Sequence, residues 1–141
     1  MKVLQHVMRN INEFNIPSTQ YGYDILYFGV NLILMFDYRL SFDVEVKNST
    51  EEIEVLILSR KEVAVWKADS SQTEMNVYYK KSGIRISDTI KPSISDAYAF
   101  IINNRTSSIT TSKNVVATLV HTWAQEVRET QLKERSSKYN Q

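Results

Sequence analysis

The sequence has no cysteine, only three glycines and two prolines, and no excess of charge: 17 Lys and Arg stand against 16 Asp and Glu in 141 residues. Without cysteine there is no disulfide framework, no thiolate metal site and no cysteine nucleophile. Three glycines leave little material for a glycine-rich loop that binds phosphate. A net charge of +1 supplies no large positive field, so we do not expect nucleic acid as a partner.

Long apolar runs and histidines are scarce as well. The longest uncharged stretch, residues 25–36, is shorter than the ~20 residues of a membrane-spanning helix. Polar residues interrupt residues 1–10, so no signal peptide is expected and the sequence predicts a cytoplasmic protein. His6 and His121 are too few for a histidine-rich metal site. No metal and no cofactor is predicted.

What the chain does contain is strand periodicity. Residues 40–46 alternate apolar side chains with polar ones, the period of two that is typical of a half-buried strand. Residues 52–58 and 96–103 are apolar enough for more central strands, and residues 113–123 form the last predicted strand. Residues 59–69 have the spacing of one or two helical turns. Gly83 suggests a hairpin between residues 74–80 and 84–89.

These patterns predict one domain of the all-β class. The expected fold is an antiparallel β-sandwich with seven or eight strands and at most one short internal helix. Residues 1–13 are expected to be an N-terminal extension and residues 14–123 the sandwich. Residues 124–141 are expected to be a charged C-terminal tail, helical or frayed, because Glu129 and Lys133 have the spacing of helical ion pairs.

Two parts of this sandwich resemble GOLD-type (Golgi-dynamics) domains. An aromatic-rich strand ends in asparagine (residues 94–104), a serine-rich loop follows, and Lys113-Asn114-Val115 opens the last strand. Residues 38–58 are similar to an earlier strand pair of these domains. The resemblance implies a jelly-roll-like sandwich that binds proteins, sometimes beside a lipid-handling domain, without catalysis. The signal peptide, paired cysteine and transmembrane helix of the cargo-receptor branch are missing, so it implies a soluble stand-alone module.

Candidate chemical groups are few. Asp43 and Glu45 share a strand face, but Arg39 and Lys47 share it too, which favours a solvated surface over an acid/base pair. The acidic group Glu51, Glu52 and Glu54 lacks the Asp/Asn ladder and turn glycine of a calcium loop. His121 has no identifiable nucleophile or orienting carboxylate, which favours a packed histidine. We therefore predict no catalytic residues and no enzyme activity.

Aromatic and basic residues give the candidate binding surfaces. Most of the eight tyrosines and both tryptophans are expected in the core, but Tyr78 and Tyr79 point to opposite strand faces, so one should be exposed. The pairs Lys80-Lys81 and Arg60-Lys61 allow only weak peripheral contact with an anionic membrane. The predicted binding residues are those expected to be exposed: Trp66, Tyr78, Tyr79, Arg128, Leu132 and Arg135.

The sequence thus favours a non-enzymatic protein-interaction, or adaptor, module of the GOLD-like kind. It would bind a protein partner, or another copy of itself, through a free sheet edge or the charged tail. One alternative is a carbohydrate- or lipid-binding sandwich, which would take a small ligand and would need clustered exposed aromatics. Another is a structural subunit, viral or from a surface layer, that assembles through its edges.

Overall fold

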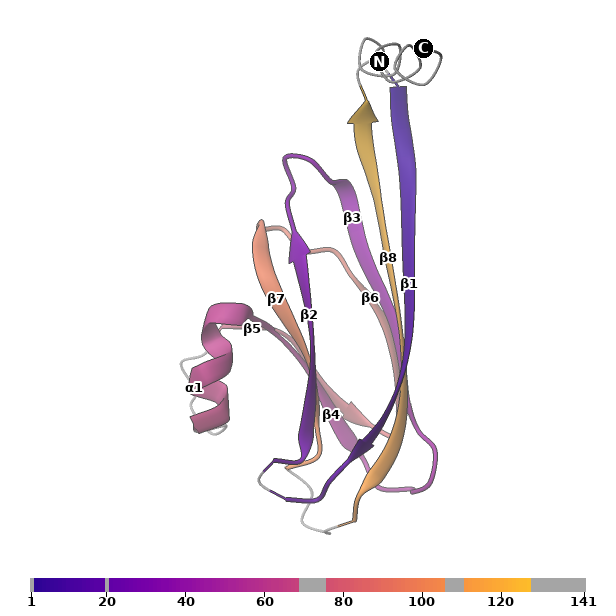
Figure 1. The fold of residues 1–141 in the computed structure, drawn as a ribbon, viewed down its shortest axis with the longest axis vertical. Coiled ribbons are helices and arrows are strands. Elements are labelled where there is room, and N and C mark those ends of the chain that lie inside the picture. The colour runs from indigo at the N-terminus through magenta and orange to yellow at the C-terminus, as the bar shows by residue number, and fades with distance from the viewer. Residues whose placement is uncertain (1, 20, 69–75, 106–110, 128–141) are drawn as a thin grey trace, which may run out of the picture.

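The computed structural model describes residues 2–19, 21–68, 76–105 and 111–127. Strands dominate this part of the chain (Figure 1). In chain order the elements are β1 (Lys2–Ile16), β2 (Tyr23–Val30), β3 (Phe36–Val46), β4 (Ile53–Ser59), the 3₁₀ turn η1 (Arg60–Glu62), α1 (Val63–Ala68), β5 (Val77–Gly83), β6 (Arg85–Ile90), β7 (Asp96–Asn103) and β8 (Lys113–Val127).

The strands form two four-stranded antiparallel sheets. Sheet A has the order β1-β8-β3-β6 and sheet B the order β2-β7-β4-β5. The sheets face each other, and α1 lies against the outer side of sheet B (Figure 1). The predicted all-β sandwich with one short helix is confirmed.

The alternation in β3 follows directly from this layering. Leu40, Phe42, Val44 and Val46 are buried between the sheets, while the intervening residues face outward and are more exposed. In β4, by contrast, every residue is buried. Its strand is central in sheet B and has the core on one face and α1 on the other, so a continuous apolar run is what its position requires.

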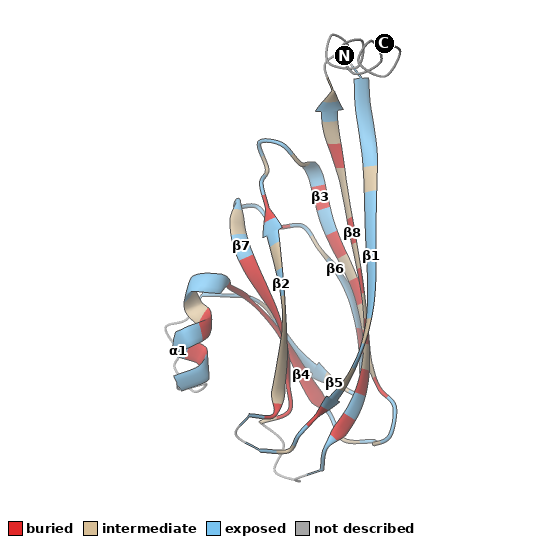
Figure 2. Cartoon of the chain, in the orientation of Figure 1, coloured by how far each residue is buried: buried red, intermediate tan, exposed pale blue. Residues whose placement is uncertain are grey.

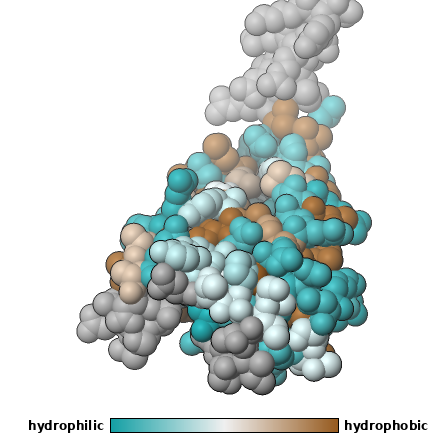
Figure 3. Space-filling model, turned by 60° about the horizontal axis from the view of Figure 1, so that its bottom comes forward, coloured by the Kyte–Doolittle hydropathy of each residue, from teal (hydrophilic) through white to brown (hydrophobic). Residues whose placement is uncertain are grey.

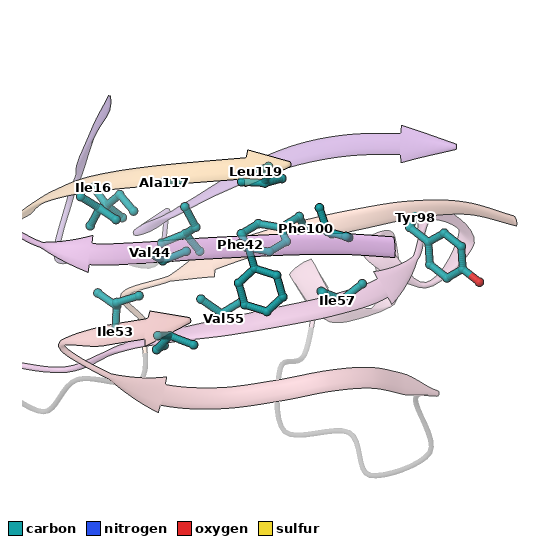
Figure 4. Close-up of a cluster of buried hydrophobic side chains, with 14 of the residues drawn as sticks. Ile16, Phe42, Val44, Ile53, Val55, Ile57, Tyr98, Phe100, Ala117 and Leu119 are labelled. Atoms are coloured by element: carbon teal, nitrogen blue, oxygen red, sulfur yellow. The ribbon is translucent and has the colours of Figure 1, made fainter. Parts of the chain in front are cut away.

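The main core fills the space between the sheets (Figure 4). Phe42 of β3 stands at its centre, with its ring centroid 5.1 Å from those of Phe100 in β7 and Tyr79 in β5. Edge-to-face contacts of this kind add to the free energy of burial. Because Phe42 belongs to sheet A and both partners to sheet B, these rings hold the two sheets together.

A second, smaller core lies on the outer face of sheet B. Val63 and Trp66 of α1 pack with Leu56, Leu58 and other residues of β4 and β7. The Arg105 guanidinium covers the Trp66 ring at 4.0 Å and donates hydrogen bonds to the carbonyls of Trp66 and Lys67. The end of α1 is therefore fixed by a residue that follows β7.

The predicted hairpin around Gly83 is wrong. β5 pairs with β4, where Gly83 lies opposite Ile53, whereas β6 pairs with β3, where Arg85 lies opposite Glu45. Ile84 therefore connects the two sheets. Residues 81–83, which the prediction placed in the turn, belong to β5, and Gly83 has no positive φ. The partners of both strands come from much earlier in the chain.

Both ends of the sandwich differ from the expected boundaries. Residues 2–13 belong to β1, whose pairing with β8 runs without a break from Lys2 opposite Val127 to Ile16 opposite Lys113. Residues 124–127 are strand and not helix, since β8 continues to Val127. The rest of the expected helical tail lies outside the described residues.

Candidate functional site

The first strand forms a free edge of sheet A. On one side β1 is hydrogen-bonded to β8 over its whole length, and within the described ranges no strand pairs with its other side. The two strands also extend beyond β3, whose pairing with β8 ends at Phe36 opposite Ala124, so their ends project as a two-stranded ribbon (Figure 1). Backbone N–H and C=O groups along such an edge can accept another strand.

Apolar side chains line this edge on both faces. Val3, Val7 and Ile11 lie on the outer face, where Val7 is 71% and Ile11 59% exposed. Leu4 and Met8 lie on the inner face and are exposed as well. Figure 2 shows the projecting length of β1 as almost entirely exposed. Several exposed apolar side chains next to one another on a strand usually mark an interaction site.

The packing of β2 explains the exposure on the inner face. The Phe28 ring of β2 lies 5.5 Å from His121 of β8 and 6.5 Å from Tyr38 of β3. The edge of sheet B is therefore beneath β8 and β3, and β1 extends past it. Met8, opposite His121 in register, is 45% exposed.

Two of the other edges, β5 and β6, carry more protection than β1, and the remaining edge, β2, is shorter, with eight residues and one charge at Asp24. β5 and β6 have seven and six residues, and Lys80, Lys81, Arg85 and Asp88 place charges on them. β1 has 15 residues, no proline, and charges at Lys2, Arg9 and Glu13 alone. Short, charged edges resist the addition of a strand, and long apolar ones favour it. The edge of β1 is thus the best candidate interaction site.

A second apolar feature lies at the same end of the molecule. Ile33, Leu34 and Phe36, in and after the turn that joins β2 to β3, are exposed. The turn is held in place because Leu32 N–H donates to Ser95 Oγ at 2.8 Å and Met35 N–H to the Asn31 carbonyl at 2.8 Å. This apolar turn lies at the end from which the ribbon projects (Figure 1).

The residues expected to bind a partner are not gathered in one place. Trp66 is 1% exposed, so the expectation that it reaches solvent is wrong. The guanidinium of Arg105 lies over the Trp66 ring, and the sequence does not predict this contact because the two residues are far apart in the chain. Tyr78 is 39% exposed and Tyr79 is half-buried, as alternating faces require. Arg128, Leu132 and Arg135 lie outside the described residues.

The acidic residues have structural partners. Asp43 accepts hydrogen bonds from Ser87 and Arg85, and these contacts hold the pKa of its carboxyl below the usual range. Glu54 accepts a hydrogen bond from Asn103 at 3.1 Å, and Glu51 lies 3.5 Å from the Lys113 amine. Within the described ranges, no three His, Cys, Asp or Glu side chains come together as a metal site.

His121 is a packed histidine. It is buried between the sheets, shares a hydrogen bond with the Tyr38 hydroxyl through Nδ1, and contacts the Phe28 ring. Burial lowers the pKa of its imidazole and raises the pKa of the Tyr38 hydroxyl, so both groups stay neutral near neutral pH. No carboxylate contacts His121 among the described residues, which argues against a catalytic triad.

A shallow hollow of 590 Å³ lies on the outer face of sheet A. Its polar residues bond to one another: Ser41 contacts Thr89 at 2.9 Å, and Asp43 contacts Ser87. The lone aromatic residue among those that line it is Phe42, which belongs to the core. The hollow therefore offers no ring on which a sugar could stack. Figure 3 shows hydrophobic and hydrophilic side chains interspersed over the face that it presents.

One buried polar cluster could not be predicted from the sequence. Asn104 and Lys113, which flank the serine-rich loop of the GOLD-like pattern, are both buried and in contact. Both residues belong to the GOLD-like pattern, but a lysine is so seldom buried that nothing in the sequence indicates that their side chains meet.

Comparison with known proteins supports the fold. No family model and no curated protein matches the chain. Among solved structures, a chain from Bacillus endospore appendages, which "form a novel family of disulfide-linked pili", is similar with a TM-score of 0.55. The two are 8% identical, and the match covers 89% of this chain and 93% of that one.

Two further structures match with lower TM-scores. They are a chain described under "CBM4 structure and function" (TM-score 0.44, 12% identity, 76% of this chain and 63% of that one) and the periplasmic inhibitor of g-type lysozyme PliG from Aeromonas hydrophila (0.41, 12%, 85% and 87%). Support for the fold comes from the appendage chain, with its TM-score of 0.55, and at 8% identity that match supports the fold alone. As for membrane spans, no helix within the described ranges is long and apolar enough to form one.

Proposed function

We propose that this chain is a non-enzymatic protein-interaction module that binds an extended segment of its partner as a new strand beside β1. The observation that carries this proposal is the free 15-residue edge with five exposed apolar side chains. In strand addition the main chain supplies hydrogen bonds, while alternate side chains supply specificity. Val7 and Ile11 on one face and Met8 on the other would contact the partner's side chains.

A non-enzymatic role is supported by how the reactive groups are used. In the described part of the chain, His121 is packed between rings and Asp43 is engaged with Ser87 and Arg85. The resemblance to GOLD-type adaptors and the cytoplasmic location stay predictions. A carbohydrate-binding role receives less support, because the exposed aromatics come from separate segments and make no ring contact with one another: Tyr21, Tyr27, Phe36 and Tyr78.

A second candidate, an assembly subunit, is favoured by the charges of β1. When two copies of β1 are placed antiparallel with Ile11 opposite Ile11, Arg9 of each copy stands opposite Glu13 of the other. Neither Arg9 nor Glu13 forms an ion pair with a described residue. The appendage protein with the similar fold forms pili, but the disulfide linkage named for it has no counterpart in a chain without cysteine.

The test compares substitutions at opposite edges of sheet A. A double variant Val7→Lys/Ile11→Lys charges the β1 edge, and Thr89→Lys charges the β6 edge as a matched control. Self-association is measured by light scattering at several concentrations, and partner capture from native lysate by quantitative mass spectrometry. We expect the β1 variant to lose binding and the β6 variant to keep it.

The same measurements separate the two candidates. Loss of a concentration-dependent oligomer in the β1 variant supports the assembly subunit, and loss of a captured protein from an otherwise monomeric chain supports the adaptor. If the β1 variant keeps every interaction of the wild type, strand addition at β1 is wrong.

A further inference from the structure

Three side chains from separate segments meet at the end of the sandwich opposite the projecting ribbon. Lys113 is the first residue of β8, Asn104 follows β7, and Glu51 precedes β4. The Lys113 amine donates a hydrogen bond to Asn104 Oδ1 and lies 3.5 Å from Glu51 Oε2. Lys113 is 0% exposed, and Asn104 is buried too. The residue opposite Lys113 in the β1–β8 register is Ile16, which belongs to the core between the sheets.

Backbone groups fix the orientation of the Asn104 carboxamide. Its Nδ2 donates to the carbonyls of Pro17 and Thr111, both at 3.1 Å, and its own N–H donates to the Gly22 carbonyl at 2.6 Å. Gly22 can approach because it has no side chain, since a Cβ there would lie 2.2 Å from the Pro17 carbonyl oxygen. The amide N–H₂ group therefore points to backbone carbonyls, and the amide oxygen points to the amine.

This arrangement places a buried nucleophile and a buried electrophile, Lys113 and Asn104, beside a partly exposed proton carrier, Glu51. Because Lys113 Nζ is hydrogen-bonded to Oδ1, it lies within attacking reach of the adjacent carbonyl carbon, Cγ. A carboxylate beside the amine can take a proton from it and return one later. We propose that Lys113 and Asn104 join through an intramolecular amide bond, with Glu51 carrying the protons.

The reaction balances without any other reagent. Glu51 takes a proton from the Lys113 ammonium, and the neutral Nζ attacks Cγ of Asn104. Nζ then releases a second proton, the Cγ–Nδ2 bond breaks, and Nδ2 receives protons through Glu51. An ammonium ion leaves, the Nζ–Cγ amide remains, and Glu51 ends as the carboxylate it was at the start. No electron is gained or lost, so no oxidant is needed.

Such a bond would tie the two sheets together. β7 belongs to sheet B and β8 to sheet A, and the bond closes the loop between them. A cross-link within one chain stabilises the fold chiefly by restricting the unfolded chain. This chain has no cysteine, so an amide would provide a covalent link that reducing agents leave intact.

The decisive measurement is the intact mass of the purified full-length chain after denaturation. We expect the wild type to weigh less than its sequence predicts by the mass of one ammonia molecule. Asn104→Ala and Glu51→Gln should have their full calculated masses. Asn10→Ala, which changes an exposed asparagine of β1, should keep the deficit. A folded wild type at full mass after long incubation overturns the proposal.

Peptide mapping locates the bond. Trypsin cleaves after Arg105, between the two residues. In the wild type, the peptide ending at Arg105 and the one containing Lys113 should stay joined after digestion, and trypsin should fail to cut after Lys113. A deficit located at another asparagine overturns the assignment. Glu51→Gln tests the proton carrier, because a folded variant that still loses ammonia contradicts the role of Glu51. The wild-type mass decides even if a variant does not fold.

Discussion

The two sheets of the sandwich use their surfaces in opposite ways. The central strands of sheet B are buried on both faces, by the main core and by α1 with Arg105 above it. Sheet A leaves its outer face in water and ends in the strand β1, which is exposed on both faces (Figure 2). Sheet B thus holds much of the stabilising packing, whereas β1 has apolar side chains that stay exposed after folding. Substitutions in the two regions should therefore have very different effects on stability.

The largest effect is expected at Trp66. Replacing this buried ring by alanine should lower the free energy of unfolding by about 3 to 5 kcal/mol, because it opens a cavity under α1. Urea denaturation followed by circular dichroism measures the loss. Val65→Ala, on the exposed side of the same helix, is the matched control and should change stability little. A loss at Trp66 no larger than that at Val65 would mean that α1 is dispensable.

A smaller loss is expected at Arg105. Arg105→Ala removes two hydrogen bonds to the end of α1 and the contact with the Trp66 ring, which together should cost about 2 kcal/mol. Arg105→Lys keeps the charge but not the planar group and should lose part of that amount. The same denaturation experiment measures both. Equal stability of the wild type and both variants would show that the contacts of Arg105 with α1 do not stabilise the fold.

The buried histidine of sheet A gives a pH dependence. Because the pKa of His121 is lowered in the folded state, the unfolded chain binds a proton more readily below the ordinary value of 6.5. Stability is thus full above that pH and falls as the pH drops below it, by at most about 1.4 kcal/mol per pH unit. His121→Gln should reduce this slope, measured by urea denaturation between about pH 5 and 7. An unchanged slope would assign the dependence to the carboxylates.

The smallest effect on stability is expected in β1. Val7→Ala removes a side chain that is mostly in water, so the free energy of unfolding should change by less than about 0.5 kcal/mol. Any oligomer or partner complex should nevertheless be weakened, as light scattering or a binding assay would show. A loss of stability close to that at Trp66 would remove the contrast between the two regions.

The layers of the fold could be predicted where one strand's own pattern decides its environment. The alternation around Phe42 and the continuous apolar run of β4 each identify how many faces of a strand are covered. Partners could not be predicted in this way. A break after Gly83 could join two strands of one sheet or of different sheets. The pairing of β5 with β4 and of β6 with β3, far earlier in the chain, makes Ile84 the connection between the sheets.

The candidate sites were harder to predict for related reasons. Residues 2–13 form a strand because backbone groups pair with β8, and backbone pairing leaves no apolar pattern in the sequence. The sequence predicts Trp66 on the surface, but the guanidinium of Arg105, a residue far away in the sequence, lies over its ring. Lys113 contradicts the usual exposure of lysine, so its contact with Asn104 could be found only in three dimensions.

The pairing of the first strand with the last also determines how the molecule should respond to mechanical force. Lys2 and Val127 lie side by side at one end of the β1–β8 ladder. If the two ends of the chain are pulled apart, the load acts across this pair and opens the backbone hydrogen bonds one after another, like a zipper. At each moment only one hydrogen-bonded residue pair of the β1–β8 ladder would then bear the force. If the force were instead applied between Lys2 and Lys113, at opposite ends of the ladder, all its hydrogen bonds would be loaded together in shear. The same sandwich should then withstand much more force.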